Sequence, residues 1–149
     1  MKIGVVIPAY NAERFVADSL GSLQAQTCAE WEAYVMDDGS RDGTLAAVRA
    51  FAAEDPRIHV WSRENRGLVA TMNELLDRLD DSVDRVAFLD IDDFIHPEMY
   101  AVLSAALDRA NADVAECSIV HVPAGASPAG VFAHPVGSPP ERVIDDMSV

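Results

Sequence analysis

Apolar runs of strand length alternate with segments of helical length along most of this chain, which restricts its possible folds more than any other feature. Apolar and β-branched clusters predict strands at residues 2–8, 32–38, 57–61, 85–90 and 113–120. Helices are expected between them, at residues 11–27, 40–55, 67–80 and 96–112. This series predicts an α/β, Rossmann-like fold, with a mostly parallel sheet and helices on both faces.

The acidic composition narrows the possible partners. The 149 residues include 25 acidic and 11 basic side chains, for a formal net charge of −14. Nucleic acids and anionic membrane surfaces are bound mainly through basic patches, so neither is expected as a main partner. A phosphate-bearing ligand would also be repelled unless a divalent cation stood between it and the acids.

Cysteine usage and hydropathy indicate the compartment. Cys28 and Cys117 lie far apart without the spacing of a metal site, which favours buried thiols in a reducing environment. The apolar run near the N-terminus is too short for a signal peptide or a membrane span, and no longer run follows it. We therefore expect a cytoplasmic protein with no transmembrane segment in this chain.

The composition changes after the last predicted strand. Residues 123–140 are rich in Pro, Gly, Ala and Ser and have no helical or strand period, which predicts a loop or linker. A folded domain is therefore expected at residues 1–122. Residues 141–149 look like the beginning of a further element, so we expect the chain to be the first part of a longer protein.

Acidic residues crowd the end of the fourth predicted strand. On an extended backbone Asp90 and Asp92 point to the same side with Ile91 opposite, and Asp93 begins a turn. Two carboxylates about 5 Å apart repel by roughly 3 kcal/mol at an effective dielectric near 20, which a cation would relieve. Hard oxygen ligands favour Mg²⁺ or Mn²⁺ over zinc. A solvated acidic turn or a helix cap remains the alternative.

Two further strand ends carry residues suited to a flat ligand. Tyr10 follows the first strand and could stack on a nucleobase, although a lone tyrosine there can equally be packed. Asp38 follows the second strand and could accept a hydrogen bond from a base edge, and Gly39 permits a close approach. The same turn could instead start the next helix, with Ser40 or Asp42 as its cap.

Taken in order, four motifs resemble the family 2 glycosyltransferases with the GT-A fold. They are IPAYN at 7–11, MDDGS at 36–40, ENRG at 64–67 and LDIDD at 89–93, supported by SLQAQT at 22–27 and DPRIHV at 55–60. The resemblance runs from residue 3 to about 120 and implies a nucleotide diphosphate sugar, expected to be a UDP-sugar, as donor. It implies substrate binding by Pro8, Tyr10, Asp38, Arg66 and Asp92, and Mg²⁺ or Mn²⁺ binding by Asp90, Asp92 and Asp93.

The chain departs from the family pattern in two places. Met72 stands where the family has Arg and Leu75 where it has Gly, so a cationic contact to the nucleotide is missing unless Arg66 replaces it. The family places its general base and acceptor-binding part beyond the acidic motif. Asp145 and Asp146 do not match that part, so no catalytic base is assigned, and residues 123–149 are interpreted as a loop and the start of an acceptor-side segment.

The resemblance implies metal-dependent, inverting transfer of a sugar to an acceptor hydroxyl in polysaccharide or cell-wall glycan synthesis. The acceptor would be a glycan or a lipid-linked molecule, and the full-length protein could act at the inner membrane face. Because the base is missing, we expect this chain alone to bind the donor without transferring it. One alternative is a degenerate or truncated nucleotide-sugar-binding domain without turnover. The other is a phosphatase with an Asp-x-Asp motif, although Phe94 replaces the Thr or Val expected there.

Overall fold

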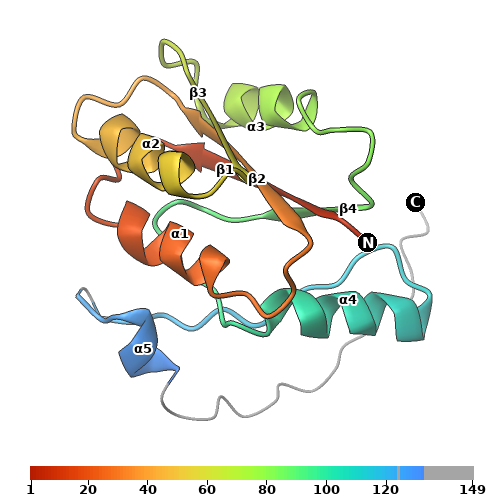
Figure 1. Cartoon of the computed structure of the whole chain (residues 1–149). Coiled ribbons are helices and arrows are strands. Elements are labelled where there is room, and N and C mark those ends of the chain that lie inside the picture. The colour runs from red at the N-terminus through yellow and green to blue at the C-terminus, as the bar shows by residue number, and fades with distance from the viewer. Residues whose placement is uncertain (124, 133–149) are drawn as a thin grey trace.

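Four parallel strands form the single sheet of the region that the structure describes. A computed structural model describes residues 1–123 and 125–132 (Figure 1). The strands are β1 (Ile3–Ala9), β2 (Trp31–Asp37), β3 (Ile58–Ser62) and β4 (Arg85–Phe88). Their order in the sheet is β3-β2-β1-β4, so β1 pairs with β2 along one edge and with β4 along the other. The strand order therefore reverses between β1 and β4.

Helices cover both faces of this sheet. They are α1 (Val16–Gln24), α2 (Thr44–Glu54), α3 (Leu68–Leu76), α4 (Met99–Ala110) and the short α5 (Pro128–Val131). Figure 1 shows α3 on the opposite side of the sheet from α1 and α4. The predicted α/β class, with a parallel sheet between helices, is confirmed.

The alternation of side chains along β1 creates two separate cores. Ile3, Val5 and Ile7 point into a large cluster with residues of α1, α2 and α4, whereas Val6 points into a smaller cluster beneath α3. Leu20 of α1 is fully buried in the large cluster, and burial of such a side chain contributes about 2 kcal/mol. The sheet is therefore fixed from both sides.

The two unusual residues of α3 belong to the smaller core. Leu75 is fully buried in one cluster with Val6, Tyr34 and Met36, and Met72 packs against the same cluster. Met72 and Leu75 therefore fill the space between α3 and the sheet.

The prediction of a strand at residues 113–120 is wrong. This segment forms no strand in the described structure, and Val114 and Ile119 are exposed. Its apolar residues suggested a strand, but a strand also needs a neighbour to pair with, and the structure pairs β4 with β1 only. Val86 and Phe88 of this edge strand are exposed as well.

Two smaller expectations about helices also need correction. α1 begins at Val16, five residues after Asn11, which adopts a left-handed conformation with φ of 48°. The predicted linker at 123–140 contains α5, whose cap Ser127 accepts a hydrogen bond from the backbone N–H of Gly130. Residues 133–149, with Asp145 and Asp146, lie outside the described residues. No helix in the described part of the chain is both long and apolar enough to cross a bilayer.

Replacing Leu75 tests the packing of α3. Leu75→Ala should lower the free energy of unfolding by about 3 kcal/mol, because it leaves a cavity in the smaller core. Leu76→Ala is the matched control on the same helix, since Leu76 is 38% exposed, and it should cost about 1 kcal/mol or less. Urea denaturation measures both, and equal losses would contradict the assignment of Leu75 to the core.

Candidate functional site

The loops that follow the four strands meet where the strand order reverses, and they surround an open cleft. In parallel sheets this edge is where ligands bind. The cleft has a volume of about 540 Å³. Five residues predicted from the sequence line it, namely Pro8, Tyr10, Asp38, Asp90 and Asp92. Arg66 and Asp93, also predicted, are not among its lining residues.

Hydrogen bonds between the loops after β1 and β2 hold Tyr10 at the cleft. Asn11 donates its backbone N–H to Ser40 Oγ at 3.0 Å, and its Oδ1 accepts the N–H of Arg41 at 2.8 Å. Tyr10 as a whole residue is 48% exposed. The tyrosine therefore offers a large aromatic face to the cleft.

Gly39 brings the loop after β2 against the loop after β3. Its φ is +75°, and a Cβ at this position would lie 2.7 Å from the backbone nitrogen of Asn65. No other residue type fits this position without displacing the neighbouring loop. The glycine expected to permit close approach of a ligand thus permits close approach of the ENRG loop.

Asp38 is a buried carboxylate at the floor of the cleft, only 4% exposed. Its oxygens accept the backbone N–H groups of Arg66 at 3.0 Å and Gly67 at 2.8 Å, and Nε of Arg63 at 3.1 Å. Burial alone would raise the pKa of Asp38, but these hydrogen bonds outweigh it and hold the pKa below its ordinary value. Asp38 is therefore ionised at neutral pH.

Arg63, which was not predicted as a site residue, supports Asp38 from behind the cleft. Besides Asp38, its guanidinium contacts Thr71 Oγ1 at 2.8 Å and forms an ion pair with Glu74 of α3. Glu74 in turn pairs with Arg78 at 2.8 Å. Arg63 therefore connects the end of β3, the acid after β2 and helix α3. An arginine in a polar loop is usually solvated, so only its position directly after a predicted strand could have drawn attention to it.

Arg66 contributes to the site through its backbone. Its N–H binds Asp38, whereas its side chain is exposed and has no partner among the described residues. The positively charged side chain of Arg66 therefore lies near the cleft, but the guanidinium that supports Asp38 belongs to Arg63.

The acidic segment after β4 is a turn instead of the extended strand end that the sequence suggested. The N–H of Asp93 binds the carbonyl of Asp90 at 2.9 Å, with Ile91 and Asp92 at the centre of the turn. Ile91 is buried while the three aspartates are exposed, so the acids and the isoleucine still face opposite ways. Desolvation, followed by the charges of Asp92 and Asp90, raises the pKa of Asp93.

The donor set of this turn fits a hard divalent cation. No group of three His, Cys, Asp or Glu residues in the described ranges is arranged to hold a metal. Mg²⁺ and Mn²⁺ are commonly bound by one or two carboxylates, with substrate phosphates and water completing the shell. Asp90 and Asp92, exposed on one wall of the cleft, are suited to that arrangement.

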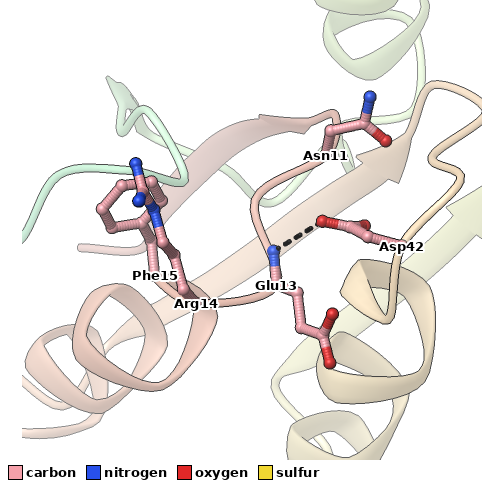
Figure 2. Close-up of a pocket in the computed structure, with 5 residues that line it drawn as sticks. All are labelled: Asn11, Glu13, Arg14, Phe15 and Asp42. Atoms are coloured by element: carbon pink, nitrogen blue, oxygen red, sulfur yellow. Dashed lines mark hydrogen bonds between the residues drawn. The ribbon is translucent and has the colours of Figure 1, made fainter.

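A second hollow lies beside the cleft, between the loops after β1 and β2 (Figure 2). Its volume is about 470 Å³, and it is lined by Asn11, Glu13, Arg14, Phe15 and Asp42. Glu13 donates its N–H to Asp42 at 3.2 Å and accepts the N–H of Gly43 at 3.0 Å. The guanidinium of Arg14 lies over the Phe15 ring at 4.4 Å. These side chains are engaged with each other, which indicates a structural role in joining the two loops.

Removing Arg63 tests whether it supports Asp38. Arg63→Ala should cost about 3 kcal/mol of stability, because it leaves a buried carboxylate without its cation. Arg49→Ala, an exposed arginine of α2, is the control and should change stability by about 0.5 kcal/mol or less. In urea denaturation, Arg63→Ala combined with Asp38→Asn should cost less than the sum of the single changes. Full additivity would show that the two residues do not interact.

Three comparisons place this site among known proteins. The profile of Glycosyl transferase family 2 matches residues 4–131. The chain is similar to the putative teichuronic acid biosynthesis glycosyltransferase TuaG of Bacillus subtilis, with 37% identity over 92 residues, which are 61% of this chain and 36% of TuaG.

Two solved structures resemble the fold closely. S. aureus TarS 1-349 in complex with UDP-GlcNAc has 31% identity and a TM-score of 0.68, over 76% of this chain and 33% of TarS. The mannosyltransferase PcManGT from Pyrobaculum calidifontis, in complex with GDP-Man and Mn²⁺, has 25% identity and a TM-score of 0.64, over 71% of this chain and 32% of PcManGT. The chain thus spans about a third of the length of these proteins. Because the family profile matches well over half of the chain, the chain belongs to glycosyl transferase family 2 and has the GT-A fold.

Proposed function

We propose that this chain is the donor-binding part of a metal-dependent, inverting glycosyltransferase that uses a UDP-sugar in polysaccharide or cell-wall glycan synthesis. The observation that carries the proposal is the composition of the cleft. One cleft contains an exposed aromatic ring, a buried ionised carboxylate and two exposed carboxylates. A nucleoside diphosphate needs these three kinds of contact for its base and for the cation on its phosphates.

Tyr10 and Asp38 are proposed to hold the base. The exposed ring of Tyr10 offers a stacking face, which is worth roughly 1–3 kcal/mol per base. Asp38 can accept a hydrogen bond from an N–H group of the base, because it stays ionised and is fixed by three donors. The TarS complex with UDP-GlcNAc supports a uracil base. Pro8 lines the same cleft, and Arg66 is proposed to approach the nucleotide from its rim.

Asp90 and Asp92, with Asp93 beside them, are proposed to hold Mg²⁺ or Mn²⁺. Asp92 is the foremost proposed metal ligand because it belongs to both forms in which the acidic motif can be written, DID and DD. Without a cation, the acidic turn and the net charge of −14 would repel a diphosphate. A bound ion would act as a Lewis acid on the leaving diphosphate. The PcManGT complex with Mn²⁺ supports this use of a divalent ion.

The acceptor side of the reaction is proposed from the family. The acceptor would be a glycan or a lipid-linked molecule, and the names of TuaG and TarS favour a cell-wall product. The donor-binding domain is proposed to span residues 1–122, and residues 123–149 are proposed to belong to the acceptor side. The proposed place of action is the cytoplasm, or the inner membrane face for the full-length protein.

A nucleotide-sugar-binding domain without turnover is the second candidate. Met72 and Leu75 favour it, because they place apolar side chains in a core where the family pattern has Arg and Gly. It differs from the first candidate only in lacking transfer, so both require donor binding in the same cleft. The phosphatase alternative has less support, since Phe94 stands where that motif has Thr or Val, and its ring packs edge-on against Phe132 at 5.6 Å.

Thermal melting with nucleotide and metal tests the proposal. UDP with Mn²⁺ at 100 times the dissociation constant should stabilise the protein by about 2.7 kcal/mol, and UDP alone by much less. Asp92→Asn should remove the metal-dependent part of the shift. Asp81→Asn, which removes an exposed acid away from the cleft, should leave that part intact. The absence of any metal-dependent shift in the wild type, with UDP or GDP, would refute the proposed function.

A further inference from the structure

Two buried polar side chains at the end of α1 have partners far away in the sequence. Ser22 lies in the last turn of α1 and Gln26 just beyond it, and they are only 5% and 7% exposed. Polar groups at such depth are costly unless they are hydrogen-bonded. The groups they bind therefore explain why they are there.

Both side chains bind the backbone that follows the acidic turn. Gln26 Nε2 donates to the carbonyl of His96 at 2.7 Å, and Gln26 Oε1 accepts the N–H of Tyr100 at 3.1 Å. Ser22 Oγ accepts the N–H of Ile95 at 3.0 Å. The segment from Ile95 to Tyr100 is thus attached to α1 by three hydrogen bonds from two side chains.

Two of these bonds satisfy backbone N–H groups, those of Ile95 and Tyr100, whereas the carbonyl of His96 also accepts the N–H of Met99 at 2.9 Å. Tyr100 is the second residue of α4, and the first N–H groups of a helix have no acceptor within the helix. The cap residue Glu98 supplies no side-chain hydrogen bond. Gln26 therefore caps α4 from the segment just beyond α1. The N–H of Ile95, a residue outside any helix or strand, receives its acceptor from Ser22 in the same way.

The acidic turn lies between this attachment and the sheet. On its upstream side, Leu89 donates its N–H to the carbonyl of Val6 at 3.1 Å, next to the last pair of β4. On its downstream side, Ile95 is held by Ser22. Asp90, Asp92 and Asp93 therefore occupy a short span whose two ends are both fixed.

We propose that Ser22 and Gln26 are positioning residues for the cation site. They act through the backbone of residues 95–100, and they hold the acidic turn in one conformation before metal and nucleotide arrive. This inference rests on the proposed function, since it takes the acidic turn as the place where the cation binds. It adds that α1, which contributes no metal ligand, determines how tightly the acidic turn binds the cation.

The chemistry of Gln26 gives two sharp variants. The amide supplies N–H donors and an acceptor oxygen at the same time, and both kinds of group are used. Gln26→Glu keeps the shape and the acceptor for Tyr100 but directs a carboxylate oxygen at the carbonyl of His96. Gln26→Met keeps the approximate volume and removes both bonds. Gln24→Met is the matched control, because Gln24 is exposed on the same helix and binds Asp55 instead.

Three measurements on the 149-residue chain test the inference. Hydrogen exchange in the metal-free protein should show faster exchange of the Tyr100 amide in Gln26→Met and of the Ile95 amide in Ser22→Ala, because each variant removes the acceptor of that N–H. Calorimetry with UDP present should show a roughly 10- to 100-fold weaker Mn²⁺ affinity, the usual effect of losing groups that orient metal ligands. Binding of UDP without metal should stay unchanged. Gln24→Met should behave like the wild type in all three.

The outcomes separate this inference from the proposed function. A wild type without Mn²⁺-dependent UDP binding would refute the proposed function and the inference together. A wild type that binds Mn²⁺ with UDP, alongside Gln26→Glu and Ser22→Ala variants of the same Mn²⁺ affinity, would overturn the inference alone. Unchanged exchange of the Ile95 and Tyr100 amides would also overturn it. If Gln26→Met does not fold, the Gln26→Glu and Ser22→Ala results decide.

Discussion

The parallel pairing of β1 with β2 on one side and with β4 on the other is the constraint on which the site depends. Because all strands run the same way, their following loops leave the sheet at one edge. Because the strand order reverses between β1 and β4, the loops that follow the strands surround a cleft at this point of the sheet edge. Residues from Pro8 to Asp92 meet there although they are far apart in the sequence.

Ionic contacts and hydrogen bonds then fix the loops around this cleft. Asp38 is buried and ionised, so it needs donors, and it takes them from the loop after β3. Arg63, which binds Asp38, also forms an ion pair with Glu74 in α3. On the other side, Gln26 and Ser22 connect α1 to the segment that follows the acidic turn. The proposed base side and the proposed cation side of the cleft are thus held by separate networks, so changes in one should leave the other largely intact.

The sequence predicts the four strands of the sheet and five of the residues that line the cleft, because both produce local patterns. Apolar runs identified β1 to β4, and the parallel arrangement implied that their ends would meet. The strand predicted at 113–120 failed because an apolar pattern does not say whether a partner strand exists. The extended form predicted for the acidic segment is wrong, because a buried Ile91 between exposed acids gives the same alternation in a turn as in a strand.

The long-range hydrogen bonds cannot be predicted from the sequence. The bond from Gln26 to His96 joins residues 70 positions apart, and a glutamine at the end of a helix gives no local sign of such a partner. Arg63 looked like any charged loop residue. In both cases a side chain is defined by its contacts with distant backbone or acid groups, which only the three-dimensional structure reveals.

A crystal structure of the chain with UDP and Mn²⁺, with the anomalous signal of manganese recorded, tests the central claim most directly. The account predicts uracil against the Tyr10 ring and within hydrogen-bond distance of Asp38, and a manganese peak coordinated by Asp90 or Asp92 and the diphosphate. A nucleotide bound in the hollow of Glu13 and Arg14, or a manganese peak away from the acidic turn, would contradict it.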